Sequence, residues 1–230
     1  MSAAQRRGTA VITGASRGIG RATALRLAAE WEIVAVARSV KELESLRREI
    51  ESAGGDCSTI ELDVTDPSAV RRALSDIDAE VLVNNAGIGI MKPLLELTVD
   101  EWRAMVAVNL DAVFYVTRAI LPGMVERGHG HVVNIGSLSG RGAFAGGTSY
   151  AATKHALVGF SESLMMEVRD AGVRVSLVMP GSVNTSFSGR EGDAGWKLAA
   201  SDVADAVMYT LHQPDNALVS RVELRPLRKS

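Results

Sequence analysis

The sequence predicts an α/β fold, a single doubly wound parallel sheet of about seven strands with helices on both faces. Apolar runs of strand length alternate with helical patterns along nearly the whole chain, which is typical of βαβ units. The length of 230 residues suits one domain with a single large core. Because no repeat, low-complexity tract or linker divides the chain, we expect residues 1–230 to form one domain.

The composition is that of an ordinary globular protein. With 25 basic and 27 acidic residues, the net charge of -2 gives no attraction to nucleic acid or to an anionic membrane. No apolar run reaches the roughly eighteen residues of a membrane span, and residues 1–8 lack the core of a signal peptide. Cys57 is the sole cysteine, and the histidines show no metal-ligand spacing. We therefore expect a cytoplasmic protein without a disulfide or a metal.

The first half of the chain begins with an expected strand over residues 9–12, a glycine-rich turn and a helix over 21–30. A second strand, 32–37, precedes a charged helix, 40–53, which ends at two glycines. A third strand covers 57–62, and Pro67 stands at the first position of the next helix. The fourth strand, 80–83, runs directly into Asn84-Asn85-Ala86-Gly87.

The second half continues the alternation. A long helical pattern covers 99–126, and a strand follows at 131–135. A glycine-rich loop, 136–147, separates this strand from a second long helix that begins near Tyr150. The sixth strand, 173–179, is stopped by Pro180-Gly181. A helix over 201–211 and a strand over 217–224 complete the pattern.

The turn after the first strand reads Thr-Gly-Ala-Ser-Arg-Gly-Ile-Gly from Thr13. A strand that breaks into glycines and then opens a helix presents unpaired N–H groups and the positive end of the helix dipole to an anion such as a pyrophosphate. The Gly-x-x-x-Gly-x-Gly spacing fits neither the Gly-x-Gly-x-x-Gly fingerprint nor a P-loop, and alone it is weak evidence. The candidate cofactor-binding residues are Gly14, Ser16, Arg17, Gly18, Ile19 and Gly20.

The second strand ends in Ala37-Arg38-Ser39, where a dinucleotide would place its adenosine ribose. No carboxylate is available there to accept the 2′-hydroxyl protons, whereas Arg38, with Arg17 nearby, favours a 2′-phosphate. NADP(H) is therefore expected in preference to NAD(H), with Arg38 and Ser39 as contacts. Taken by itself, Arg38 could equally be a solvated surface charge. Asp63 and Val64 follow the third strand at the same edge, where Asp63 could bind the adenine amino group.

Several separated motifs between residues 9 and 185 together resemble the short-chain dehydrogenase/reductase family. They are the glycine turn, Asp63-Val64, Asn84-Asn85-Ala86-Gly87, Asn109, Ser137, Tyr150-x-x-x-Lys154 and Pro180-Gly181. The resemblance implies a Rossmann-type, NAD(P)-dependent oxidoreductase, usually a dimer or tetramer. It also implies that Asn85, Ala86 and Gly87 border the cofactor and that Pro180, Gly181, Val183 and Thr185 flank the nicotinamide. Two departures are Gly136, where many relatives have serine, and a short segment between Thr185 and Ser201.

The resemblance assigns an active site to Asn109, Ser137, Tyr150 and Lys154. Hydride transfer to a carbonyl leaves an alkoxide that needs a proton, which Tyr150 would supply. Lys154 stands four residues later on the same helix face, where it should lower the pKa of Tyr150 and hold the cofactor ribose. Ser137 would orient the substrate oxygen. Asn109 would, by the resemblance, support a water that relays protons to Lys154.

The sequence thus predicts an NADP(H)-dependent oxidoreductase that interconverts a carbonyl and a secondary alcohol. An NAD-dependent alcohol dehydrogenase and a non-catalytic NADP sensor are the alternatives. Pocket segments at 88–95, 138–148 and 182–196 are mostly small or apolar and suggest a neutral or apolar substrate. The two long helices are expected to form a homodimer or homotetramer interface. The basic tail, 225–230, is expected only to be solvated.

Overall fold

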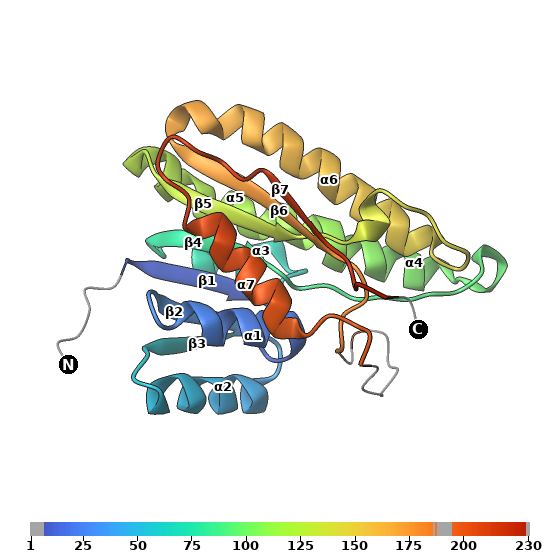
Figure 1. The fold of residues 1–230 in the computed structure, drawn as a ribbon, viewed down its shortest axis with the longest axis horizontal. Helices are drawn as coiled ribbons and strands as arrows, with labels where there is room; N and C mark the ends of the chain where they lie inside the picture. The colour runs from blue at the N-terminus through green and yellow to red at the C-terminus, as the bar shows by residue number, and fades with distance from the viewer. Residues whose placement is uncertain (1–6, 186, 188–194, 229–230) are drawn as a thin grey trace.

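The computed structural model describes residues 7–185, 187 and 195–228, and it confirms the expected α/β fold with one seven-stranded sheet (Figure 1). All neighbouring strands are parallel, in the order β3-β2-β1-β4-β5-β6-β7. The strands are β1 (Thr9–Thr13), β2 (Glu32–Ala37), β3 (Cys57–Glu61), β4 (Ala79–Asn84), β5 (Gly130–Ile135), β6 (Val173–Pro180) and β7 (Arg221–Leu224).

The described α-helices cover both faces of this sheet. They are α1 (Gly18–Leu27), α2 (Val40–Ser52), α3 (Pro67–Leu74), α4 (Val99–Val106), α5 (Ala112–Arg127), α6 (Thr148–Val168) and α7 (Ala200–Leu211). Short helical turns are η1 (Leu94–Glu96), η2 (Ala107–Asp111), η3 (Leu138–Gly140) and η4 (Arg169–Ala171).

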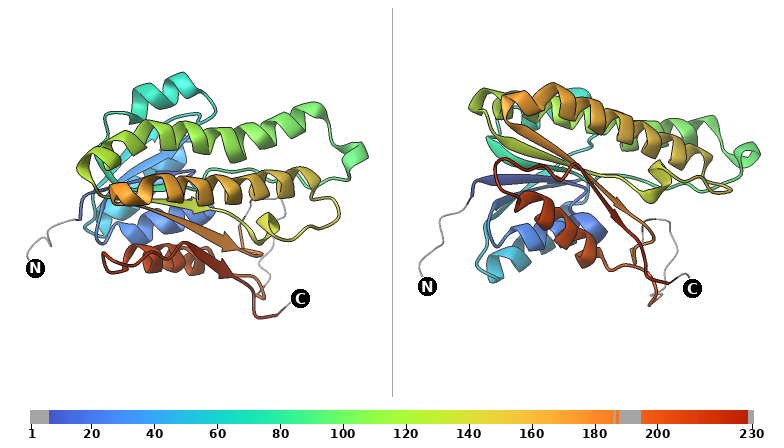
Figure 2. Two further views of the ribbon diagram at one scale, coloured as in Figure 1. Left: turned by 90° about the horizontal axis from the view of Figure 1, so that it is seen from above. Right: turned by 45° about the horizontal axis from the view of Figure 1, so that its top comes forward.

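Alternation along the strands divides the core in two. On β1, Ala10 and Ile12 face α1, α2 and α7, whereas Val11 faces α3, α5 and α6. Figure 2 shows α5 and α6 on the opposite side of the sheet from α7. Because strands buried on both faces read as continuous apolar runs, this arrangement explains why the strands were recognisable in the sequence.

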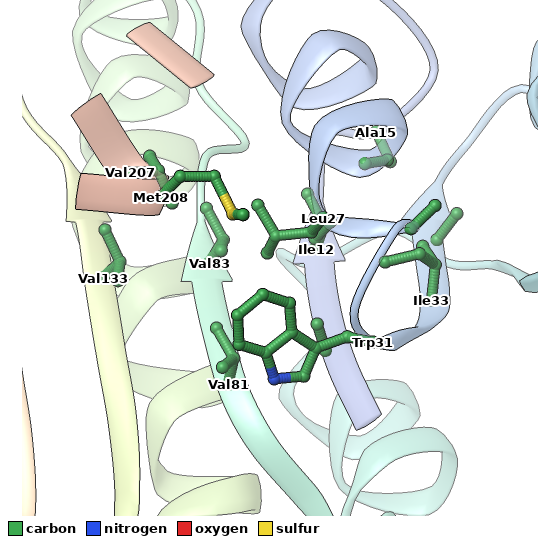
Figure 3. Packing of buried hydrophobic residues seen from close by; sticks show 14 of the residues in the cluster. Ile12, Ala15, Leu27, Trp31, Ile33, Val81, Val83, Val133, Val207 and Met208 are labelled. Atoms are coloured by element: carbon green, nitrogen blue, oxygen red, sulfur yellow. The ribbon is translucent and has the colours of Figure 1, made fainter. Parts of the chain in front are cut away.

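Trp31, at the turn between α1 and β2, fills the centre of the first core. It is 3% exposed and belongs to the same cluster as Ile12, Val81 and Val83 (Figure 3). On its outer side the Arg7 guanidinium lies 5.5 Å from the indole centroid. This one large side chain ties the start of β2 to the central strands β1 and β4.

The helical run Val99–Arg127 is continuous but not uniform. Between α4 and α5 the turn η2 is a π-helix, and Asn109 lies within it. Wide turns of this kind are rare and occur often at functional sites. The sequence predicted a plain helix over 99–126, because a π-turn has no distinct hydrophobic period. By length and mean hydropathy (1.5) this run would also pass as a membrane span, a test that core helices of soluble proteins pass as well.

The largest differences from the predicted boundaries lie at both ends of α1, which ends at Leu27 rather than at residue 30, and at the start of β7. Helix α1 begins at Gly18 rather than at residue 21, so the last glycines of the turn belong to its first turn. Strand β7 begins at Arg221 rather than at residue 217. Before β7, the Val219 carbonyl accepts a hydrogen bond from the Ser176 side-chain hydroxyl on β6 (2.6 Å).

Strand β1 lies at the point where the strand order reverses. The chain proceeds from β1 outward to β2 and β3 and then returns to β4 on the other side of β1. In open α/β sheets, ligands bind outside the carboxyl ends of the strands at such a switch point. The crevice between the β1 and β4 ends is therefore where the predicted cofactor loop and Asn84-Asn85-Ala86-Gly87 meet.

Candidate active site

The glycine turn is shaped by close backbone approach. Gly14 and Gly18 have positive φ values of 65° and 56°. A Cβ on Gly20 would stand 2.3 Å from the Gly14 carbonyl oxygen, so a side chain there would push the turn away from α1. The N-cap residue of α1, Arg17, makes no side-chain cap hydrogen bond. The first N–H groups of α1 therefore donate no hydrogen bond to a capping side chain, which is the arrangement that suits a bound phosphate.

The glycine turn is fastened to the end of β4 through Thr13 and Asn85. The Thr13 hydroxyl accepts hydrogen bonds from the N–H groups of Asn85 (3.0 Å) and Ala86 (3.1 Å). In return, the Asn85 amide donates to the carbonyls of Thr13 (2.9 Å) and Gly14 (3.2 Å). Asn85 thus borders the crevice, as predicted, while its side chain serves the architecture of the turn.

The ends of β1, β2 and β3 bring Arg17, Arg38 and Asp63 to the same edge of the sheet. Arg17 and Arg38 are both exposed, and neither forms an ion pair with another described residue. Asp63 accepts hydrogen bonds from the backbone N–H (3.0 Å) and the hydroxyl (2.7 Å) of Thr65. These bonds, aided by the Arg38 charge, hold the pKa of Asp63 below its ordinary value. Ser39, the N-cap residue of α2, leaves its hydroxyl unused as a cap.

The side chains of Ser137, Tyr150 and Lys154 lie together near the carboxyl end of β5. Each is nearly buried, with exposed fractions of 8%, 8% and 6%. The Lys154 ammonium donates to the Ile135 carbonyl at the end of β5 (2.9 Å) and lies 5.9 Å from the centroid of the Tyr150 ring. Ser137, two residues after Ile135, is hydrogen-bonded to the Tyr150 phenol. The spacing of four residues on α6 therefore directs Lys154 to the end of β5 and Tyr150 to Ser137, two residues beyond it.

Burial sets the ionisation of this group. It lowers the pKa of Lys154 to about 8 and raises the pKa of Tyr150, while the hydrogen bond from Ser137 opposes the rise. A net lowering of the Tyr150 pKa is therefore wrong for the protein chain alone, because burial makes the net shift upward. The Lys154 ammonium is directed to the Ile135 carbonyl.

Asn109 acts as a buried clamp. Its Oδ1 accepts from the Ile88 N–H (2.8 Å), and its Nδ2 donates to the Ile88 carbonyl (2.9 Å) and to the Thr153 hydroxyl (3.2 Å). The Thr153 hydroxyl in turn donates to the Tyr150 carbonyl (2.9 Å). Both amide hydrogens of Asn109 are thus engaged by protein groups, so its side chain positions α6 and the segment after β4. Any support of a water would have to come from its main chain.

The segment after β6 closes the other side of the crevice. The Gly181 N–H donates to the Leu224 carbonyl (2.8 Å), and Val183 pairs with Leu198 in an isolated bridge. Thr185 lies against the glycine turn, because a Cβ on Gly18 would be 3.2 Å from its methyl carbon. The predicted contacts Pro180, Gly181, Val183 and Thr185 therefore come from one segment that faces the turn. Residues 186 and 188–194, which belong to the short segment between Thr185 and Ser201 and to the predicted pocket segment 182–196, lie outside the described residues.

Phe187 lies in the predicted pocket segment 182–196, although the sequence analysis did not single it out. Its ring packs edge-to-face on Tyr150, with 5.8 Å between centroids. A Cβ on Gly89 would stand 2.5 Å from the Phe187 ring, so glycine at this position makes room for it. The only available signal was the pair of glycines at 87 and 89, which does not reveal the partner.

A buried polar network beneath the site was also missed. The Asn84 amide donates to the Thr117 hydroxyl and to Asn134 Oδ1, both at 2.9 Å, and the Asn134 amide donates to the Ser161 hydroxyl at 2.8 Å. These residues are 0% to 3% exposed and come from β4, α5, β5 and α6. The network fixes α6 against β5, one layer below the contact between Lys154 and Ile135. Asparagines inside apolar strands were the signal.

A model of the family described as short chain dehydrogenase matches residues 8–194. The chain belongs to the short-chain dehydrogenase family. It is therefore an oxidoreductase acting on CH–OH groups, with a Rossmann-type fold.

This short-chain dehydrogenase is similar to curated sequences and to solved structures of other enzymes. It is 34% identical over 239 residues to the NADP-dependent 3-hydroxy acid dehydrogenase YdfG of Escherichia coli strain K12, covering 96% of this chain and 95% of that protein. A metagenomic short-chain oxidoreductase in complex with NADP superimposes with a TM-score of 0.86 at 36% identity, covering 97% and 99% of the two chains. The closed form of serine dehydrogenase complexed with NADP+ gives 0.87 at 32% identity, covering 94% of each chain.

Proposed function

We propose that this protein is an NADP(H)-dependent oxidoreductase that interconverts a carbonyl and a secondary alcohol, using Ser137, Tyr150, Lys154 and Asn109. The observation that carries the proposal is the burial of Ser137, Tyr150 and Lys154 around the end of β5, beside the switch-point crevice. A phenol, a hydroxyl and an ammonium gathered there are the groups needed to bind and protonate an alkoxide.

The residues at the crevice fit NADP(H). Gly14, Gly18 and Gly20 allow the close approach that a pyrophosphate needs, and α1 begins without a capping side chain. Arg17 and Arg38 lie where a 2′-phosphate would need cations. NADP(H), when bound, supplies the acceptor or donor of the hydride. The relatives named above are NADP-dependent or were solved with NADP, which supports this preference over NAD(H).

The protein groups divide the proton chemistry. Because the pKa of Tyr150 is raised, its phenol is neutral near pH 7 and is ready to donate a proton to a nascent alkoxide. Ser137 holds the substrate oxygen beside that phenol. Lys154, mostly protonated at neutral pH, stabilises the phenolate left after the proton is transferred. Asn109 positions Tyr150 through Thr153.

The substrate proposed is a small 3-hydroxy acid or the matching keto acid. The relatives named as 3-hydroxy acid dehydrogenase and serine dehydrogenase act on molecules of this kind, and both span nearly the whole chain. The Phe187 ring packs edge-to-face on Tyr150 and lies against Gly87 and Gly89, and a ring so close to the phenol favours a small substrate.

Replacing Tyr150 by Phe tests the catalytic assignment. Tyr150→Phe should reduce NADPH formation from a panel of hydroxy acids and secondary alcohols to background, while calorimetry shows NADP+ binding within about twofold of the parent. Tyr209→Phe is the matched control, because Tyr209 is 58% exposed on α7. Retained turnover in Tyr150→Phe would refute the assignment. Binding of NADP+ by the parent without turnover of any panel member would favour the sensor.

We also propose a cytoplasmic homodimer or homotetramer formed through the long helices. Apolar side chains are exposed on them, namely Trp102 on α4, Phe114 and Val125 on α5 and Met166 on α6. Burying such side chains between copies is the usual use of an exposed apolar face. Light scattering at micromolar concentration should give a multiple of the 24.4 kDa chain mass; a monomer would contradict the proposal.

A further inference from the structure

An open pocket of about 470 Å³ lies directly beside Ser137. It is lined by Leu138, Ser139, Arg141, Gly142, Ala143, Glu223 and Arg225. The turn that forms one wall is tied to Ser137, because the Ser139 N–H donates to its hydroxyl (3.1 Å) and the Gly140 N–H to its carbonyl (2.9 Å). Arg141 therefore stands one short turn from the residue proposed to hold the reacting oxygen.

The other wall comes from the far end of the sequence. After β7, the chain passes along the same sheet edge, where the Leu224 carbonyl bonds to the Gly181 N–H. A Cβ on Gly181 would lie 3.0 Å from Pro226 and 3.1 Å from Leu138. Figure 1 shows β7 running beside β6 to this edge of the sheet. The C-terminal segment thus carries Arg225 to the rim of the site, although the sequence suggested only a solvated tail.

The pocket carries more positive than negative charge. Glu223 accepts hydrogen bonds from Arg141 (2.8 Å, through Oε1) and from Arg225 (3.1 Å, through Oε2). Two guanidinium groups thus share one carboxylate, with the Arg221 Nε 4.0 Å away, and among the described residues no other acidic side chain lines the pocket. The Arg141 and Arg225 side chains are 55% and 66% exposed, so a ligand can reach the N–H groups that Glu223 leaves unused.

We propose that this pocket binds the carboxylate of the substrate, with Arg141 and Arg225 as the recognising groups and Glu223 as the residue that holds them in place. A guanidinium presents paired N–H donors that match the two oxygens of a carboxylate. Glu223 keeps its own charge over the working range because both arginines lower its pKa. The inference rests on the proposed function, since it assumes that the reacting carbon lies at Ser137 and Tyr150.

A pair of substrates that differ only in charge tests the inference. With NADP+, the parent should oxidise 3-hydroxybutyrate with kcat/KM at least about tenfold above that for its methyl ester. In the double variant Arg141→Gln/Arg225→Gln, KM for the acid should rise about 10- to 100-fold, the range expected for lost charge-assisted hydrogen bonds. The ester should react at the parent rate. Arg26→Gln is the control, because Arg26 is a similarly exposed arginine paired with Asp205 on another surface.

A binding measurement separates this inference from the proposed function. Butyrate cannot react. With the parent it should give an NMR saturation-transfer signal that levels off as its concentration rises, and butyramide should give none. The signal should be lost in the double variant and kept in Arg26→Gln. Equal kcat/KM of the parent for the acid and the ester would overturn the carboxylate pocket, as would equal binding of butyrate by the parent and the double variant. Neither result would contradict the proposed oxidoreductase activity. Butyrate binding without any turnover would support the pocket and count against the reaction.

Discussion

Thr13 and Thr23 are two buried threonines near the glycine turn whose hydroxyls have opposite surroundings. Thr13 is 2% exposed, and its hydroxyl accepts two backbone hydrogen bonds that fasten the turn to the segment after β4. Thr23, on α1, is 0% exposed, and its hydroxyl has no hydrogen-bond partner among the described residues. Replacement by Val keeps the shape of the side chain and removes only the hydroxyl. The two substitutions should therefore change the free energy of unfolding differently.

The size of each change in the free energy of unfolding follows from the number of hydrogen-bond donors that the substitution leaves without a partner. An unsatisfied buried donor costs about 1–3 kcal/mol. Because Asn85 and Ala86 are only partly buried, the lower end applies to each N–H group, and Thr13→Val should lower the free energy of unfolding by about 2 kcal/mol. Thr23→Val relieves a buried hydroxyl that forms no bond, so it should leave the free energy of unfolding unchanged or raise it by up to about 1 kcal/mol.

Urea denaturation at one fixed protein concentration measures both effects. With a slope of about 2–3 kcal/mol/M, Thr13→Val should shift the midpoint down by roughly 0.7–1 M, and Thr23→Val should shift it little or upward. Thr13→Val should also weaken NADP+ binding measured by calorimetry, because the turn loses its attachment to the other side of the crevice. Equal midpoint shifts for the two variants would refute the reasoning.

Two further predictions concern pH and the coenzyme. His131 is buried with its Nε2 2.8 Å from the Ser176 hydroxyl, and burial, with a smaller effect of Arg174, lowers its pKa to about 3. The unfolded chain, with a histidine pKa near 6.5, therefore binds more protons between pH 6.5 and 3, so stability should fall as the pH falls through this window. His131→Gln should reduce the pH dependence of the free energy of unfolding, obtained from urea denaturation at each pH, by up to about 1.4 kcal/mol per pH unit. The exposed His155→Gln should leave this dependence unchanged. The same pH dependence in His131→Gln as in the parent would contradict the burial argument. Arg38→Ala should raise KM for NADP+ about 10- to 100-fold and leave KM for NAD+ within about twofold, with Arg48→Ala as the control. A parallel change for both coenzymes would show that Arg38 does not contact the 2′-phosphate.

The fold was predictable because its periodicities are strong. A central parallel strand such as β1 is apolar on both faces, so the run Ala10, Val11 and Ile12 is readable without knowledge of its neighbours. The ends of β1, β4 and β5 were recognisable because glycine, asparagine and serine interrupt those runs. Parallel topology then brings all these ends to one edge, which is why Ser137, Tyr150 and Lys154 could be grouped in advance.

What the sequence could not predict depends on contacts between distant segments. The direction of the Tyr150 pKa shift depends on the burial of the phenol, opposed by Ser137, and a spacing along the helix reveals neither. The role of Asn109 depends on a π-turn that aligns its amide with Ile88 and Thr153. Likewise, Arg225 looked like an ordinary terminal charge because nothing in its local sequence indicates that β7 ends beside Ser137.

The path of the chain after β7 has a practical consequence for anyone who handles the protein. Leu224 and Pro226 pack against Gly181 and Leu138, so whatever is joined after them starts beside the pocket lined by Arg141, Glu223 and Arg225. An affinity tag or fluorescent fusion placed at that end would crowd this pocket and add its own charges beside the two arginines. Such additions belong before β1, whose first residue lies at the opposite edge of the sheet.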